Sequence, residues 1–251
     1  MIDIKNKLKN EENVYGTWCT IPSPEVSDII SNAGLDFIII DMEHGIMDYK
    51  TAQMMSITAQ SNNCSSLIRI PYINESNILK SYEIGSNGIV VPHVKNINDV
   101  NDILKYYKYP PDGNKGYSPY TRASKYHVQE KYLKTSNKNQ LVSVIIEDKE
   151  GLENIENIAK NKEIDVIYIG TYDLSLSLNC DINDNKVKDE LERCVEIIRK
   201  HKISAGCLYH NSKELNYFKK IGINFLVYGV DSKIIYENYN KIKWIKNQKL
   251  L

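Results

Sequence analysis

The sequence lacks a surplus of charge of either sign. Its 32 Lys and Arg residues are matched by 32 Asp and Glu residues, so the formal net charge at pH 7 is zero. A surface that binds nucleic acid or anionic lipid needs an excess of basic side chains to neutralise phosphate groups. We therefore expect neither a nucleic acid nor a membrane among the partners of this protein.

Long apolar runs and paired cysteines are missing as well. No stretch approaches the roughly 20 apolar residues of a membrane-spanning helix, and the charged segment 1–16 has no apolar core of the kind that a signal peptide needs. The five cysteines are scattered and never spaced as C-x-x-C, which argues against a disulfide framework and against a zinc site. These absences predict a soluble, cytoplasmic protein.

The chain also lacks any Ser/Gly-rich linker or long charge block that would mark a domain boundary. Instead, short runs rich in Ile, Val and Tyr recur at fairly even intervals, with segments of helical periodicity between them. These runs cover residues 14–20, 37–41, 65–70, 88–94, 141–147, 165–171, 204–209 and 225–231. Apolar runs bounded by helices are typical of parallel strands that are buried on both faces.

Eight strand–helix units in 251 residues match the (β/α)8 barrel of the α/β class in count and in length. We therefore expect a single domain, a TIM barrel over residues 1–251. An open doubly wound sheet is the rival fold, but no G-x-G-x-x-G motif follows the first predicted strand. Gly34, Gly85 and Gly222 stand where predicted helices should end.

Ionisable residues stand where the predicted strands stop. Asp41 and His44 come after the second strand, Arg69 closes the third, Glu147 the fifth, and Asp173 follows the sixth. Active sites of (β/α)8 barrels lie at the C-terminal ends of the strands. We therefore expect these five side chains to meet at one mouth of the barrel.

Glu147 and Asp173 follow neighbouring strands, so their carboxylates should face each other. Such a pair suits a hard divalent cation, which takes one or two protein carboxylates and leaves its other positions to water and an oxygen-rich substrate. The alternative is that both carboxylates cap the helices that begin beside them.

Arg69 and His44 are the candidates for proton and charge chemistry. Arg69 could hold a keto oxygen or stabilise an enolate, or it could simply brace the mouth by an ion pair with Asp41. His44 could serve as a general base, because histidine titrates near neutrality. Glu43 receives no role, and neither does His93, which we expect to lie within a strand.

A buried strand-end lysine, which Schiff-base aldolases require, is missing from the pattern. Only Lys95 and Lys149 fall near strand ends, and both stand just past them in charged stretches. A metal-dependent enolate mechanism is the better match to these residues.

The sequence resembles the HpcH/HpaI aldolase family over nearly the whole chain. The resemblance depends on blocks in a fixed order, among them "GTW", "AGLDFIIIDMEHG", "LIRIP", "EIGSNGIVVPHV", "YPPDGNKGYSPYTRAS", "VIIEDKEGLENI", "YIGTYDLSLSLN" and "GINFLVYGVD". It implies a (β/α)8 barrel whose last helix is exchanged between subunits of a homo-oligomer, a trimer of dimers. It also implies a divalent cation, Mg²⁺, Mn²⁺ or Co²⁺, that binds pyruvate.

The resemblance also implies roles for residues. Glu147 and Asp173 correspond to the metal ligands, Arg69 to the residue that stabilises the enolate oxygen, and His44 to the base. Asp41 joins the catalytic set, and Glu83 stands where an acidic residue supports the histidine. The substrate carboxylate would bind to the segment Gly170, Thr171, Tyr172 and Asp173. Arg69 would also contact the substrate.

Three positions depart from the family pattern. Glu83 replaces the usual Asp, so its charge is kept but its reach differs by one methylene. Ile145 stands where the aldolases commonly carry a substrate-contacting Gln, and it cannot donate a hydrogen bond. Lys115 replaces the arginine of the "PP-x-G-x-R-G" loop, which is not an equivalent exchange where a bidentate contact is needed.

We therefore expect a class II aldolase that cleaves or forms a 4-hydroxy-2-oxo acid, with a 2-oxo acid (pyruvate or oxaloacetate) and an aldehyde as its small-molecule partners. One alternative, suggested by Ile145 and Glu83, is a variant that condenses oxaloacetate with acetyl-CoA to citrate, with no need for a metal. Another is a non-catalytic barrel that binds an oxo acid.

Overall fold

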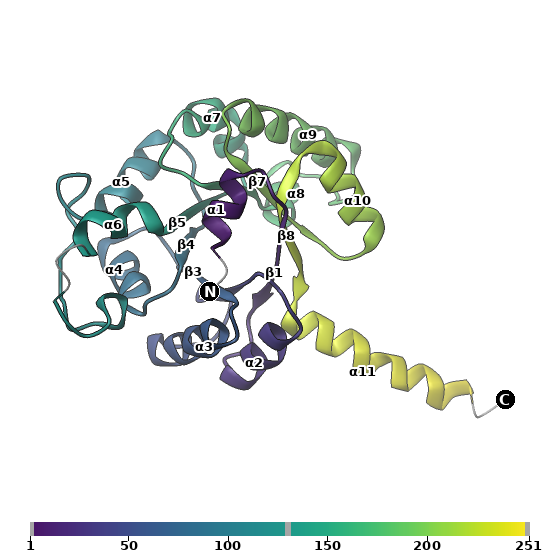
Figure 1. Cartoon of the computed structure of the whole chain (residues 1–251). Helices are drawn as coiled ribbons and strands as arrows, with labels where there is room; N and C mark the ends of the chain where they lie inside the picture. Colours follow the sequence, from purple (N-terminus) through teal and green to yellow (C-terminus); the bar gives the residue numbers. More distant parts are fainter. Residues whose placement is uncertain (1–2, 129–131, 249–251) are drawn as a thin grey trace.

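Eight parallel strands close into a barrel in the order β1 to β8, which confirms the predicted fold (Figure 1). The computed structural model describes residues 3–128 and 132–248. The strands are β1 Val14–Cys19, β2 Phe37–Asp41, β3 Ser65–Arg69, β4 Gly88–Val91, β5 Leu141–Ile146, β6 Val166–Ile169, β7 Ser204–Tyr209 and β8 Ile223–Val230. Each of them falls on one of the apolar runs.

Helices follow the strands, as the periodicity predicted. They are α2 Pro24–Asn32, α3 Tyr49–Ser61, α4 Glu75–Glu83, α5 Ile97–Tyr107, α7 Lys149–Ala159, α8 Thr171–Ser177, α9 Asn185–Lys200, α10 Ser212–Ile221 and α11 Asp231–Gln248. The periodicity did not indicate α8, α1 Ile4–Lys9, α6 Tyr132–Asn139 or the 3-10 turn η1 Arg122–Ser124. Within the described residues, no helix is long and apolar enough to cross a membrane.

Local side chains explain where these helices begin and end. Asp48 and Asn74 accept hydrogen bonds from the main-chain N–H groups of Thr51 and Asn77, and so cap α3 and α4. The predicted helix-ending glycines Gly34, Gly85 and Gly222 all have positive φ, which glycine adopts without steric cost.

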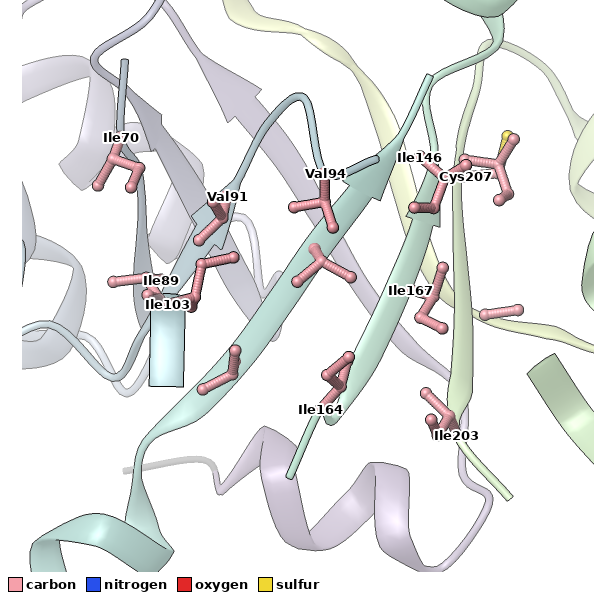
Figure 2. Packing of buried hydrophobic residues seen from close by; sticks show 14 of the residues in the cluster. Ile70, Ile89, Val91, Val94, Ile103, Ile146, Ile164, Ile167, Ile203 and Cys207 are labelled. Carbon is pink, nitrogen blue, oxygen red and sulfur yellow. The ribbon is translucent and has the colours of Figure 1, made fainter. Parts of the chain in front are cut away.

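Two apolar layers hold the barrel together because strand residues alternate between its inside and its outside. Phe37 of β2 stacks on Phe225 of β8 inside the barrel, with ring centres 4.3 Å apart. The neighbouring Ile38 and Ile40 belong to the outer layer, which packs the strands against the helices. Figure 2 shows part of that outer layer, including Ile103 of α5.

The two ends of the chain take different places. Ile4 and Leu8 of α1 join the inner layer, and Lys5 pairs at 2.9 Å with Asp165, which precedes β6. The helix α1 therefore closes the N-terminal end of the barrel, and the C-terminal mouth lies opposite it. The last helix, α11, extends away from the barrel (Figure 1).

Candidate active site

A cavity of about 280 Å³ lies at the C-terminal mouth of the barrel. It gathers every predicted site residue except Glu83. Its lining consists of Trp18, Thr20, Asp41, His44, Arg69, Ile145, Glu147, Tyr168, Gly170, Thr171, Tyr172, Asp173, Leu208 and Val230. Among the described residues no lysine lines it.

Asp41, the last residue of β2, organises one side of this cavity. Its Oδ1 accepts hydrogen bonds from the main-chain N–H groups of Glu43 at 3.0 Å and His44 at 3.1 Å. The same carboxylate receives the Nε and Nη2 donors of Arg69. Asp41 is almost fully buried, so its contribution is to hold the turn that carries His44 and to orient Arg69.

Arg69 is held on three sides. Asp41 binds it in bidentate fashion, the carboxylate of Glu43 lies 3.0 Å from its Nη1, and its guanidinium packs over the ring of Trp18. Burial opposes its charge, but the contacts with Asp41 and Glu43 outweigh that cost and raise the pKa of Arg69 above its ordinary value. The predicted ion pair with Asp41 is therefore present, and it does not consume all five N–H groups of the guanidinium.

Glu147 and Asp173 lie on the opposite side. Glu147 follows β5 and is buried, whereas Asp173 lies in the first turn of α8 and is exposed. Burial raises the pKa of Glu147, and the nearby charges of Glu43 and Asp173 add to the effect, while contacts with His93 oppose it. Gly170 makes room for this carboxylate, because a Cβ there would lie 3.1 Å from Glu147 Oε2.

His93 and Glu43, which the sequence left without roles, form part of the site. The prediction that His93 lies within a strand is wrong, because β4 ends at Val91 and His93 follows it in a loop. Its ring contacts Glu43 and Glu147 at 2.8 and 2.9 Å. The sequence signal was its position near the end of the apolar run 88–94, where a strand of average length that begins at Gly88 would stop.

The predicted pair of His44 and Glu83 does not form within one chain. His44 is exposed in the β2–α3 loop at the cavity, whereas Glu83 ends α4 and pairs with Lys80 at 2.9 Å. In the described part of the chain, no hydrogen bond or ion pair joins the two. Helix α4 directs Glu83 to a separate surface depression, beside Arg122.

The two other departures from the family pattern lie in different places. Ile145 lines the cavity and is buried, so it contributes an apolar wall where a polar contact would otherwise stand. Lys115 is not among the residues that line the cavity. Its Nζ lies 2.8 Å from the centre of the Tyr82 ring and 3.9 Å from that of Tyr109.

The donor set at the mouth fits a divalent cation. Two carboxylates face one cavity, and the small number of protein ligands leaves positions for water and substrate oxygens, as Mg²⁺ sites usually do. Among the described residues, no group of three or more His, Cys, Asp or Glu residues is placed to hold a metal ion, so the protein would supply only these two carboxylates.

Helix α8 provides a further polar surface. It begins at Thr171, no side chain caps its first turn, and the residues of that turn line the cavity. Tyr172 extends from it to His210, with 3.0 Å between the hydroxyl oxygen and Nε2.

Comparisons with known proteins agree with this geometry. The model of the family described as HpcH/HpaI aldolase/citrate lyase matches residues 15–237. Similar proteins include a hydroxypyruvate/pyruvate aldolase of Paraburkholderia phytofirmans, 25% identical over 237 residues and 91% of each chain. A 5-keto-4-deoxy-D-glucarate aldolase of Klebsiella pneumoniae is 27% identical over 232 residues and 90% of each chain.

Solved structures extend the likeness to the whole fold. The crystal structure of citrate synthase SbnG superposes with a TM-score of 0.90 at 27% identity, covering 99% of each chain. An HpcH/HpaI aldolase/citrate lyase family protein from Burkholderia cenocepacia gives a TM-score of 0.92 at 21% identity, covering 98% of this chain and 100% of the other. At that identity the second likeness concerns the fold alone.

Proposed function

Since the chain belongs to the HpcH/HpaI aldolase/citrate lyase family, we propose that it is a class II aldolase that cleaves or forms a 4-hydroxy-2-oxo acid. One observation carries the proposal: a single cavity brings the carboxylates of Glu147 and Asp173 together with Arg69 and His44. These groups supply what the reaction requires, namely oxygen ligands for a cation, a fixed positive charge and a base.

Glu147 and Asp173 are the proposed ligands of a divalent cation, Mg²⁺, Mn²⁺ or Co²⁺. When bound there, the cation would act as a Lewis acid toward the 2-oxo acid. Other groups of the protein bind the remaining parts of the substrate. The first turn of α8, from Gly170 to Asp173, receives the substrate carboxylate, because helix N-termini favour anions.

Arg69 stabilises the negative charge that develops on the C2 oxygen. Two of its five N–H groups donate to Asp41, and Glu43 is an ion-pair partner of Nη1, so N–H groups remain for the substrate. Because Asp41, Glu43 and Trp18 hold the guanidinium in place, it needs no reorganisation as the enolate forms.

His44 is the proposed base. In the cleavage direction it removes the proton from the C4 hydroxyl, the C3–C4 bond breaks, and the electron pair of that bond passes into the enolate of pyruvate. The aldehyde leaves with the former hydroxyl oxygen as its carbonyl oxygen. Return of a proton to C3 gives pyruvate, and the reverse sequence adds pyruvate to an aldehyde.

Pyruvate release tests the proposal directly. Candidate 4-hydroxy-2-oxo acids are incubated with the protein, and pyruvate is detected by coupling to lactate dehydrogenase. We expect EDTA to abolish release and Mn²⁺ or Mg²⁺ to restore it, and E147Q and D173N to be inactive. The proposal fails if an active substrate is turned over equally well after metal removal.

The second candidate function is a citrate-forming condensation of oxaloacetate with acetyl-CoA. Two observations favour it: the apolar Ile145 in the cavity wall and the likeness to citrate synthase SbnG at 27% identity. Thiol release from acetyl-CoA that depends on oxaloacetate, with no pyruvate release from any hydroxy-oxo acid, would replace the aldolase proposal by this one.

We also propose that the chain assembles into a homo-oligomer through α11. An apolar groove of about 510 Å³ lies between α2 and α11, and Ile29 and Tyr239 at its rim are largely exposed. Exposed apolar surface of this kind is typical of subunit contacts. Light scattering should give a mass several times that of one chain for the wild type, and a smaller mass for an I29E/Y239E variant.

A further inference from the structure

His93 occupies a position that few residues tolerate. Its φ of 57° lies in the left-handed region, which among side-chain-bearing residues is entered mainly by Asn, Asp and His. Backbone conformations of this kind are retained where the surrounding contacts fix them, often at functional sites. The contacts that fix His93 all lead to carboxylates of the candidate active site.

Three contacts of His93 involve these carboxylates. Its main-chain N–H donates to Glu147 Oε1 at 2.6 Å, and its ring Nδ1 lies 2.9 Å from the same oxygen. Its Nε2 lies 2.8 Å from Glu43 Oε1. His93 therefore makes two contacts with Glu147, the proposed cation ligand, and one with Glu43, the ion-pair partner of Arg69.

The double contact determines which oxygen of Glu147 is available. Oε1 accepts the hydrogen bond of the His93 main chain and also lies against the His93 ring, so this oxygen faces His93 rather than the cavity. Oε2 is left on the side of Gly170, where the absence of a side chain leaves it uncovered. The Glu147 carboxylate is thus held with one oxygen committed to the protein and one open.

The contact with Glu43 connects the two halves of the site. Glu43 lies between His93 and Arg69, and Arg69 in turn binds Asp41. The result is a continuous row of alternating basic and acidic groups from Glu147 to Asp41. Removal of His93 interrupts this row between the proposed cation ligand and the proposed enolate-binding arginine.

We propose that His93 is a positioning residue that presents Glu147 to the cation through Oε2 alone and sets its placement relative to Arg69 through Glu43. The inference deepens the proposed function, because it depends on Glu147 as a cation ligand. In other metalloproteins, replacing a residue that orients a metal ligand typically weakens metal affinity by roughly 10–100-fold.

Substitutions at position 93 can separate the two ring contacts. Asn carries an amide nitrogen near the place of Nδ1, so H93N can keep the side-chain contact with Glu147. Gln carries its amide near the place of Nε2, so H93Q can keep the contact with Glu43. H93A keeps neither, and all three variants retain the main-chain N–H.

The decisive measurement is the affinity of the metal-free protein for Mn²⁺. Free Mn²⁺ is detected in the titration by its electron paramagnetic resonance signal. We expect H93A and H93Q to bind Mn²⁺ about tenfold or more weakly than the wild type, and H93N to stay within about threefold of it. H201A is the matched control, because His201 forms a similar 2.9 Å contact with Glu156 away from the cavity. Wild-type Mn²⁺ affinity in H93A would overturn the proposal, and so would a tighter one.

A second measurement separates failure of this inference from failure of the proposed function. If E147Q binds Mn²⁺ as the wild type does, Glu147 is not a ligand and the metal-dependent proposal falls. The thermal unfolding of metal-free H93A, E147Q and H93A/E147Q shows separately whether His93 holds Glu147 in place, whatever Glu147 binds. If the Tm shift of the double variant is well short of the sum of the two single shifts, the contact between His93 and Glu147 is supported. An additive shift overturns the positioning role.

Discussion

The guanidinium carbon of Arg69 lies 4.4 Å from the centre of the Trp18 ring. The ring is itself fixed, because Trp18 Nε1 donates to the hydroxyl of Tyr168 at 3.2 Å and the two rings meet edge to face. A planar cation thus lies between an aromatic face and the Asp41 carboxylate. Only an arginine can fill both contacts at once, because the lysine ammonium is a compact point charge without a fork of donors.

An R69K variant should therefore lose most of its aldolase activity although the charge is kept. We expect kcat to fall by about 10² or more, because a preorganised donor to the developing oxyanion is removed. The assay is coupled pyruvate release with Mn²⁺ at saturation. W18F keeps an aromatic face and should lose much less, so an equal loss in both variants would count against the fork as the important property.

The proton-transfer role of His44 predicts a different pattern. In H44N we expect kcat to fall by about 10²–10⁴, the usual contribution of a positioned base, with Mn²⁺ affinity unchanged. E83Q should retain wild-type turnover per chain, because Glu83 pairs with Lys80 rather than with His44. Full turnover by H44N on any active substrate would remove His44 from the mechanism.

Lys115 predicts a pH dependence of stability. Burial lowers its pKa to about 6, against the opposing charge of Glu83. In the unfolded chain the lysine has its ordinary pKa of about 10.4. Between about pH 6 and pH 10 the unfolded chain therefore binds more protons than the folded protein, so the free energy of unfolding rises with pH. Between pH 7 and pH 9 this group alone should add about 2–3 kcal/mol to the free energy of unfolding.

The K115M variant tests that effect. Methionine can keep the packing against Tyr82 and Tyr109 but carries no charge. Denaturant unfolding at pH 7 and pH 9 should show the variant more stable than the wild type, with the larger difference at pH 7. K95M is the control, because Lys95 is exposed and loosely paired with Asp148 and Glu150. An equal difference at both pH values would show that Lys115 does not titrate as its burial implies.

Gly16 predicts a packing limit inside the barrel. A Cβ at this position would overlap the ring of Phe37, which is fully buried and stacked on Phe225. We expect G16A to lower the free energy of unfolding by about 1–3 kcal/mol through overpacking. G116A is the matched control, because a Cβ there meets nothing within 4 Å. Equal stability of the two variants would contradict this account of the inner layer.

The architecture could be predicted from the sequence because its signals are local. Every strand appeared as an apolar run, and the helix-ending glycines have the positive φ expected of them. The position of Asp41, Arg69 and Glu147 at strand ends was enough to predict that they share a mouth, because parallel strands of a closed barrel all end on the same side. Asp173 followed from the same reasoning, although it is the third residue of α8 and not a strand residue.

The contacts between these residues were decided only by the tertiary structure. The order of residues does not predict that His93, in the loop after β4, adopts a positive φ and contacts Glu147. It does not predict the ion pair between Glu43 and Arg69 either. The separation of Glu83 from His44 and the burial of Lys115 among tyrosines depend on how helices pack around the barrel. Hydrophobic periodicity records which face of an element is buried, whereas these partnerships depend on the closure of the barrel and the path of its loops, which join residues far apart in the chain.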